Sequence, residues 1–181
     1  MNGPGFARFK AAVFGLLACN AGAYVAFGRA TEATDSVAWF VLLALFELET
    51  AHAQRLRGAA AALVRSGRLV AGIAVVAAAA GFFIEREWLD AVNAALWIAV
   101  VLVLELEVRF MDAVARHRRL FAGVLGGLYA GLAGLAIAWA SHGEWFDAYD
   151  AALWLVAFVT IEINVLEIVR ADEAAKAGPA C

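Results

Sequence analysis

The chain has 181 residues, of which 65% are hydrophobic and 17% are charged, and its formal net charge at pH 7 is −3. A soluble domain carries about 25% charged residues, so an ordinary soluble fold is excluded, and the acidic balance argues against nucleic acid as a partner. The apolar residues are collected into long runs, which leave no room for a soluble catalytic domain on either side of a membrane.

Six apolar segments follow one another along the chain, and each is long enough, or nearly so, to cross roughly 30 Å of hydrocarbon as a helix. They predict an all-α integral membrane protein, with a single transmembrane domain of six helices over residues 1–181 and a cytoplasmic tail over 171–181. The segments cover residues 11–28, 36–54, 69–84, 88–108, 120–140 and 145–169.

The first segment shares features with a signal peptide, because Arg8 and Lys10 precede an apolar run with small residues around Cys19. Two observations favour a retained helix. The run continues past Cys19 to Phe27, and the segment has counterparts later in the chain, which a cleaved peptide would not have. We therefore expect the first segment to belong to the bundle.

The basic residues predict the orientation of the bundle. Of the 14 lysines and arginines, only Arg29 and Arg86 fall on one side of the predicted spans. Basic residues concentrate in cytoplasmic loops, so both termini are expected in the cytoplasm, and the protein in a bacterial inner membrane.

A pattern repeats three times along the chain, with a period of 58 and then 57 residues. Aligning the tryptophans of the second, fourth and sixth segments brings a glutamate into register eight residues after each of them. The repeats cover about 11–57, 69–115 and 120–172, and each starts and ends on the same side, so they are parallel repeats with an expected approximate threefold arrangement. The aligned residues are Trp39, Trp97 and Trp154, followed by Glu47, Glu105 and Glu162.

The recurring glutamates are the first candidate site. A carboxylate at the centre of a spanning helix costs roughly 2.5–3.5 kcal/mol on insertion scales, so it is a functional candidate by default. Three carboxylates around a common axis could relay protons or bind a divalent cation. The candidate cation-binding residues are Glu47, Glu105 and Glu162, with Glu49, Glu107 and Asn164 two residues after them.

A structural role is the alternative for these glutamates. Arg109 follows Glu105 by four residues, and His52 follows Glu49 by three. Side chains at these spacings meet on one face of a helix. Such pairs would lock helix ends together rather than bind a ligand.

A second set of polar residues recurs at the opposite ends of the same three helices. These residues predict an outer vestibule that concentrates cations, although acids at helix N-termini beside water also need no transport to explain them. The set consists of Glu32, Asp35, Asp90, Asn93, Asp147 and Asp150.

Together these patterns predict a membrane cation channel or transporter, for protons or divalent cations, with an intramembrane carboxylate ring. The alternative is a non-catalytic accessory or assembly subunit of a larger membrane complex. The expected partners are the lipid bilayer, a cation, and further copies of the chain or other membrane subunits. We expect no cofactor and no enzymatic activity, because the chain has one Glu-x-x-His where a di-iron site needs two; the residues do not identify a metal.

Overall fold

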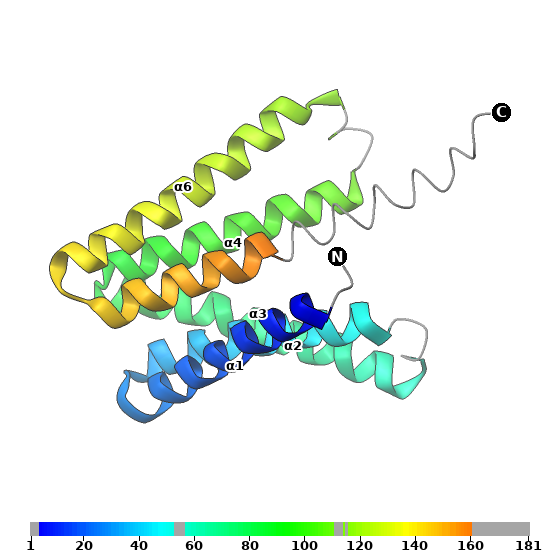
Figure 1. Ribbon diagram of the computed structural model, residues 1–181, viewed down its shortest axis with the longest axis horizontal. Helices are drawn as coiled ribbons and strands as arrows, with labels where there is room; N and C mark the ends of the chain where they lie inside the picture. The colour runs from blue at the N-terminus through cyan, green and yellow to red at the C-terminus, as the bar shows by residue number, and fades with distance from the viewer. Residues whose placement is uncertain (1–3, 53–56, 111–113, 115, 161–181) are drawn as a thin grey trace.

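The computed structural model describes residues 4–52, 57–110, 114 and 116–160, and every regular element among them is an α-helix. Figure 1 shows the long helices lying roughly along one direction as a bundle. They are α1 (Pro4–Phe27), α2 (Ala30–His52), α3 (Ala59–Glu85), α4 (Trp88–Arg109) and α6 (Arg118–His142), followed by a helical segment over residues 145–160.

Four helices in the described part of the chain are long and apolar enough to cross a membrane, so the protein is a helical membrane protein. They cover Gly5–Phe27, Ala59–Glu85, Trp88–Glu107 and Arg118–His142. The helices run beyond the predicted spans; α3, for example, begins at Ala59 rather than near residue 69. Hydropathy marks only the part of a helix that suits hydrocarbon, whereas the backbone hydrogen bonds continue through the interface.

α2 differs from these four in its distribution of charge. Glu32 and Asp35 lie near its first residue, and Glu47 and Glu49 lie near its last. The stretch without charged residues is therefore limited to residues 36–46, which is shorter than the roughly 20 residues that a spanning helix needs. These four acids are also among the residues whose positions recur along the sequence.

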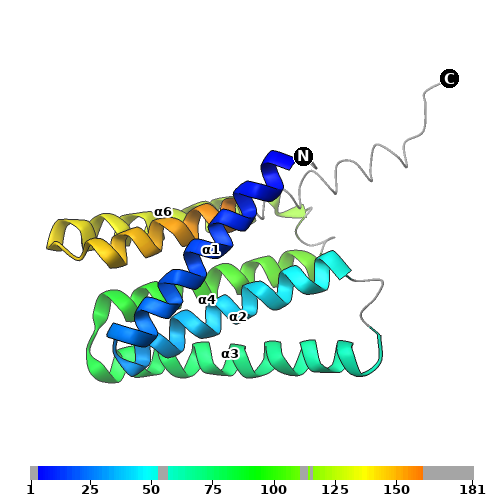
Figure 2. The same ribbon diagram turned by 60° about the horizontal axis from the view of Figure 1, so that its bottom comes forward.

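Neighbouring helices pack against one another in pairs. α2 packs against α1 and α3, and α4 packs against α3 and α6. α1 also reaches residues 145–160, because Asn20 hydrogen-bonds to Asp150 and Tyr24 to Asp147. The turns at residues 28–29, 86–87 and 143–144 gather at one end of the bundle, which we call the turn end (Figures 1 and 2).

The centre of the bundle is apolar. Leu17, Val75 and Leu132 are almost fully buried, with exposed fractions of 2%, 3% and 1%. They lie one on each of α1, α3 and α6 and are 58 and then 57 residues apart, which is the period found in the sequence. Together with Val100, which has no exposed surface, they belong to the main core cluster.

The α1–α2 turn depends on a close approach at Gly28. A Cβ atom there would lie 2.7 Å from the backbone oxygen of Tyr24, and the backbone cannot move as a flexible side chain could. We expect Gly28→Ala to lower the free energy of unfolding by about 1–3 kcal/mol, as overpacking does, measured by denaturant titration in mixed micelles.

Gly22 provides the matched control, because nothing lies within 4 Å of the Cβ position there. Gly22→Ala lies inside α1 and is expected to stabilise the helix by about 0.5–1 kcal/mol. Effects of equal sign for the two substitutions would contradict the assignment of Gly28 as a tight contact.

Candidate functional site

Helical spacing brings the repeated polar residues and the repeated tryptophans onto one face of each helix. On α2, Asp35 and Trp39 follow Glu32 by three and seven residues. Residues at these spacings lie on the same side of a helix. The equivalent residues on α4 are Asp90, Asn93 and Trp97, and those of residues 145–160 are Asp147, Asp150 and Trp154.

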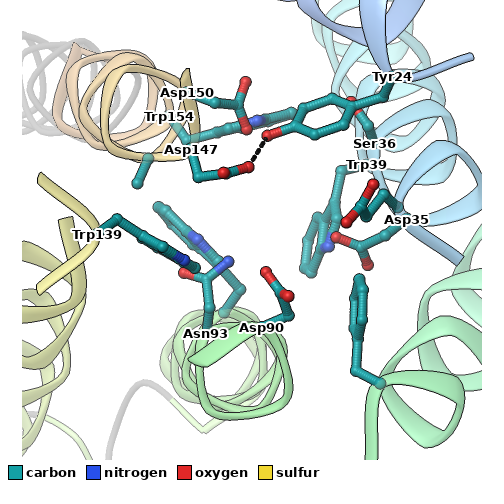
Figure 3. Close-up of a pocket in the computed structure, with 14 residues that line it drawn as sticks. Tyr24, Asp35, Ser36, Trp39, Asp90, Asn93, Trp139, Asp147, Asp150 and Trp154 are labelled. Carbon is teal, nitrogen blue, oxygen red and sulfur yellow. Dashed lines mark hydrogen bonds between the residues drawn. The ribbon is translucent and has the colours of Figure 1, made fainter. Parts of the chain in front are cut away.

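The three faces meet in a cavity at the turn end of the bundle, where the space available to the centre of a water molecule is about 50 Å³. Figure 3 shows carboxylates from three helices pointing toward this space. We call it the acid–aromatic cavity. It is lined by Tyr24, Glu32, Asp35, Ser36, Trp39, Phe82, Asp90, Asn93, Trp97, Trp139, Asp147, Asp150, Ala151 and Trp154.

Three tryptophans from the repeat lie next to one another beneath the acids. The ring centroids are 6.4 Å apart for Trp39 and Trp97, 6.5 Å for Trp39 and Trp154, and 6.5 Å for Trp97 and Trp154. All three side chains are buried and belong to the same core cluster as Leu17 and Val100. The polar part of the cavity therefore ends on an apolar floor.

Two donors on α1 hold the acids of residues 145–160. The amide Nδ2 of Asn20 donates to Oδ1 of Asp150 at 2.8 Å, and the hydroxyl of Tyr24 donates to Oδ1 of Asp147 at 2.8 Å. The second bond is drawn in Figure 3. Hydrogen bonds to a carboxylate are stronger than those between neutral groups, so they fix both side chains at the wall of the cavity.

Arg29, in the α1–α2 turn, contacts the acids on the other side. Its guanidinium lies 2.6 Å from Glu32, 2.5 Å from Glu87 and 3.4 Å from Asp90. Partial burial lowers the pKa of Arg29, but the hydrogen bond and charge of Glu32, with the charges of Glu87 and Asp90, raise it by more. Arg29 therefore stays positively charged and neutralises part of the negative charge around the acid–aromatic cavity.

Three buried polar atoms of the cavity lining have no hydrogen-bond partner among the residues that the structure describes. They are Oδ1 of Asp35, Oδ1 of Asn93 and the indole Nε1 of Trp39. Trp39 is only 8% exposed, and Figure 3 places its ring beside Asp35 in the cavity. Leaving a buried donor or acceptor unsatisfied costs about 1–3 kcal/mol, so these atoms are available to a bound molecule or to water.

The structure thus brings together all six residues of the predicted vestibule: Glu32, Asp35, Asp90, Asn93, Asp147 and Asp150.

The glutamates near the opposite end lie beside basic side chains. Lys10 lies 2.5 Å from Glu47, Arg68 lies 2.6 Å from Glu49, and Arg109 lies 2.6 Å from Glu105. The pair of Glu105 and Arg109 on α4 is the one that their four-residue spacing predicts.

Three predicted cation ligands remain: Glu107, Glu162 and Asn164. Glu107 is half-buried, and Glu162 and Asn164 lie outside the described residues. The predicted carboxylate ring stays a prediction, with basic partners beside two of its three members.

Sequence reasoning missed the aromatic walls of the cavity. Tyr24, Phe82 and Trp139 line it from α1, α3 and α6. They are 58 and then 57 residues apart, which is the period of the repeat. Extending the alignment from the even-numbered segments to the odd ones would have found them.

No protein-family model matches the sequence, and neither the curated proteins nor the solved structures include a significant match.

Proposed function

We propose that this chain is a membrane cation channel or transporter that admits its cation through the acid–aromatic cavity. The observation that carries the proposal is the convergence of the six predicted vestibule residues on one cavity, above three buried tryptophans. A concave, low-dielectric site lined by negative charge raises the local concentration of cations. The site proposed for the cation is therefore this cavity, in place of the ring formed by Glu47, Glu105 and Glu162.

The proposed architecture is six spans in three parallel repeats around an approximate threefold axis. Supporting it, the first helix of each repeat touches the second helix of the preceding one: α3 contacts α2 and α6 contacts α4. α1 contacts residues 145–160 through Asn20 and Tyr24, which closes the ring. The nearly equal distances among Trp39, Trp97 and Trp154 support the same arrangement.

The proposed orientation places the turn end outside a bacterial inner membrane and both termini in the cytoplasm. The charge distribution supports it, since Lys10, Arg68 and Arg109 lie toward the end opposite the turns, and cytoplasmic loops are enriched in basic residues. The cavity would then open toward the periplasm.

In this proposal the tryptophans form the barrier to passage. Apolar constrictions gate ion pathways because water leaves them, and the three tryptophans both line the cavity and belong to the apolar core cluster. Passage would need these rings to move apart. The glutamates at the other end would then receive the cation after their basic partners move away.

Purified full-length protein in liposomes tests the proposal. We expect cation flux above that of protein-free liposomes, measured with internal potassium-, magnesium- and pH-sensitive dyes. A variant with Glu47, Glu105 and Glu162 all replaced by Gln should retain cation flux, because the proposed cation site is the cavity and not the ring. If that variant alone abolishes flux, while changes in the cavity have no effect, the site is the ring and not the cavity.

The ion pairs at the cytoplasmic end favour the second candidate, an assembly subunit. Glu47–Lys10, Glu49–Arg68 and Glu105–Arg109 join or brace helix ends without any ligand. This role predicts no flux in liposomes for any cation and stoichiometric copurification with other membrane proteins. Flux that depends on the cavity would exclude it as the main function.

Arg29 supplies a prediction specific to the cavity. Because its guanidinium neutralises Glu32, Glu87 and Asp90, we expect Arg29→Gln to raise the apparent affinity for the transported cation by roughly threefold to tenfold. The stability should fall by less than about 1 kcal/mol, since partly exposed ion pairs contribute little. Flux as a function of cation concentration measures the first effect and thermal unfolding the second.

Arg86 is the matched control, because it lies at the same end in the α3–α4 turn. Neither arginine lines the cavity, but Arg29 forms ion pairs with two acids of its lining, Glu32 and Asp90. Arg86→Gln should leave the apparent affinity nearly unchanged. A weaker affinity after Arg29→Gln would show that Arg29 organises the acids rather than competing with the cation.

A further inference from the structure

The acid–aromatic cavity has two chemically different parts. Five carboxylates lie among its lining residues, and six aromatic side chains surround the remainder. The acids are Glu32, Asp35, Asp90, Asp147 and Asp150; the aromatic residues are Tyr24, Trp39, Phe82, Trp97, Trp139 and Trp154. The faces of aromatic rings attract cations, and tryptophan attracts them most strongly.

Most of the carboxylates already have donors. Asp147 and Asp150 accept hydrogen bonds from α1, and Glu32 and Asp90 lie against Arg29. Asp35 differs, because its Oδ1 atom is buried without a partner in the described part of the chain, as is Oδ1 of Asn93. The unsatisfied atoms of the cavity lining are therefore two acceptors, on Asp35 and Asn93, and one donor, the indole Nε1 of Trp39.

A ligand that fits this combination must be positively charged and must donate hydrogen bonds. An ammonium group does both: its N–H groups donate to carboxyl and amide oxygens such as those of Asp35 and Asn93, and its charge is attracted to indole rings such as those that line the cavity. A quaternary ammonium ion has no N–H group, so it would leave both oxygens unsatisfied.

Metal cations fit the side chains less well. No group of three or more acids, histidines or cysteines among the described residues is arranged to hold a metal ion. Divalent cations prefer six or more oxygen ligands, and the aromatic floor supplies none. The lining therefore favours a cation that binds through N–H donors and ring faces over one that needs a shell of oxygens.

The size of the cavity limits the ligand. Space of about 50 Å³ for the centre of a water molecule accommodates a few water-sized groups, since a single water needs roughly 10–15 Å³. An ammonium ion or an alkylammonium ion with one or two carbons meets this limit.

We propose that the acid–aromatic cavity binds ammonium or a short primary alkylammonium ion, with Asp35 and Asn93 accepting its N–H groups and the tryptophans facing its charge. This inference rests on the proposed function for the location of the cation site. It adds the chemical class of the cation.

Binding is tested on the full-length protein in detergent by calorimetric titration at constant ionic strength. Ammonium chloride and methylammonium chloride are the probes; tetramethylammonium, sodium and magnesium chlorides are the comparisons. We expect saturable binding of the two probes with an affinity about tenfold or more above that of each comparison salt. The probes alone can donate N–H hydrogen bonds to the two acceptors, whereas tetramethylammonium has no N–H group and metal ions need more oxygen ligands than the described residues of the lining bring together.

Two variants change one acceptor each. Asp35→Asn replaces the carboxyl group by an amide, and Asn93→Leu replaces the amide by a larger apolar group with the same branching; each should weaken methylammonium binding about tenfold. Trp145→Phe is the control, because Trp145 is 70% exposed and outside the cavity lining. Thermal unfolding of each variant shows whether the fold is retained.

Equal affinity for tetramethylammonium, sodium or magnesium would overturn the inference, as would unchanged methylammonium binding in both Asp35→Asn and Asn93→Leu. If other cations cross the membrane by way of the cavity and ammonium is not preferred, the proposed function is supported and this inference is contradicted. Selective ammonium binding without flux would support this inference and contradict transport.

Discussion

Replacing Asp35 and Asp150 together by asparagine should reduce cation flux in liposomes by roughly tenfold or more, because the cavity then loses much of the negative charge that attracts the ion. Both residues line the acid–aromatic cavity from different helices. Asparagine has nearly the same shape as aspartate, and it keeps an oxygen that can accept from Asn20, which now bonds to Asp150. The change is therefore electrostatic rather than steric.

The matched control removes a carboxylate from the same end of the bundle but outside the cavity. Glu144 lies in the turn between α6 and the helical segment 145–160, is exposed, and is not part of the cavity lining. Glu144→Gln should leave flux within about twofold of the unmodified protein, since an exposed charge is screened by salt. Equal losses from the two variants would mean that general surface charge, and not the cavity, governs flux.

The second large effect is on stability and concerns Trp97. Its ring lies 6.4 Å from Trp39, 6.5 Å from Trp154 and 4.6 Å from Phe158, measured between centroids, and the residue is 5% exposed. We expect Trp97→Ala to lower the free energy of unfolding by about 3–5 kcal/mol, through lost contacts and the cavity left behind. Denaturant titration in mixed micelles, followed by helical circular dichroism, measures it.

Trp88 is the control for this prediction. It begins α4 and is 56% exposed, with Phe83 as its aromatic neighbour. Trp88→Ala should cost less than about 1 kcal/mol, because few buried contacts are lost. If Trp88→Ala and Trp97→Ala destabilise equally, the cluster of Trp39, Trp97 and Trp154 does not hold the helices together.

The sequence predicted the helices well because the membrane imposes a strong local rule. A run of apolar residues must be helical to satisfy its own backbone, so α3 and α6 were found from hydropathy alone. The starts of two helices were less well predicted. α3 begins at Ala59 and α1 at Pro4, ahead of basic residues that interrupt the apolar run: Arg65 and Arg68 in α3, and Arg8 and Lys10 in α1.

The cavity was partly predictable for a different reason. Glu32, Asp35 and Trp39 share a helix face by their spacing alone, and repetition of the pattern indicated that the faces belong together. The contact between Lys10 and Glu47, which are 37 residues apart, depends on how α1 crosses α2. No local spacing contains that information, and the interpretation of Glu47 changes with it.

The contact of Arg29 with Glu87 has a consequence for the proposed three-repeat architecture. In that alignment Arg29, Glu87 and Glu144 are equivalent positions. Three identical two-helix chains in the proposed arrangement would carry the same charge at each of these positions, and like charges would repel. A single polypeptide can instead carry opposite charges at Arg29 and Glu87, so that these two turns attract each other.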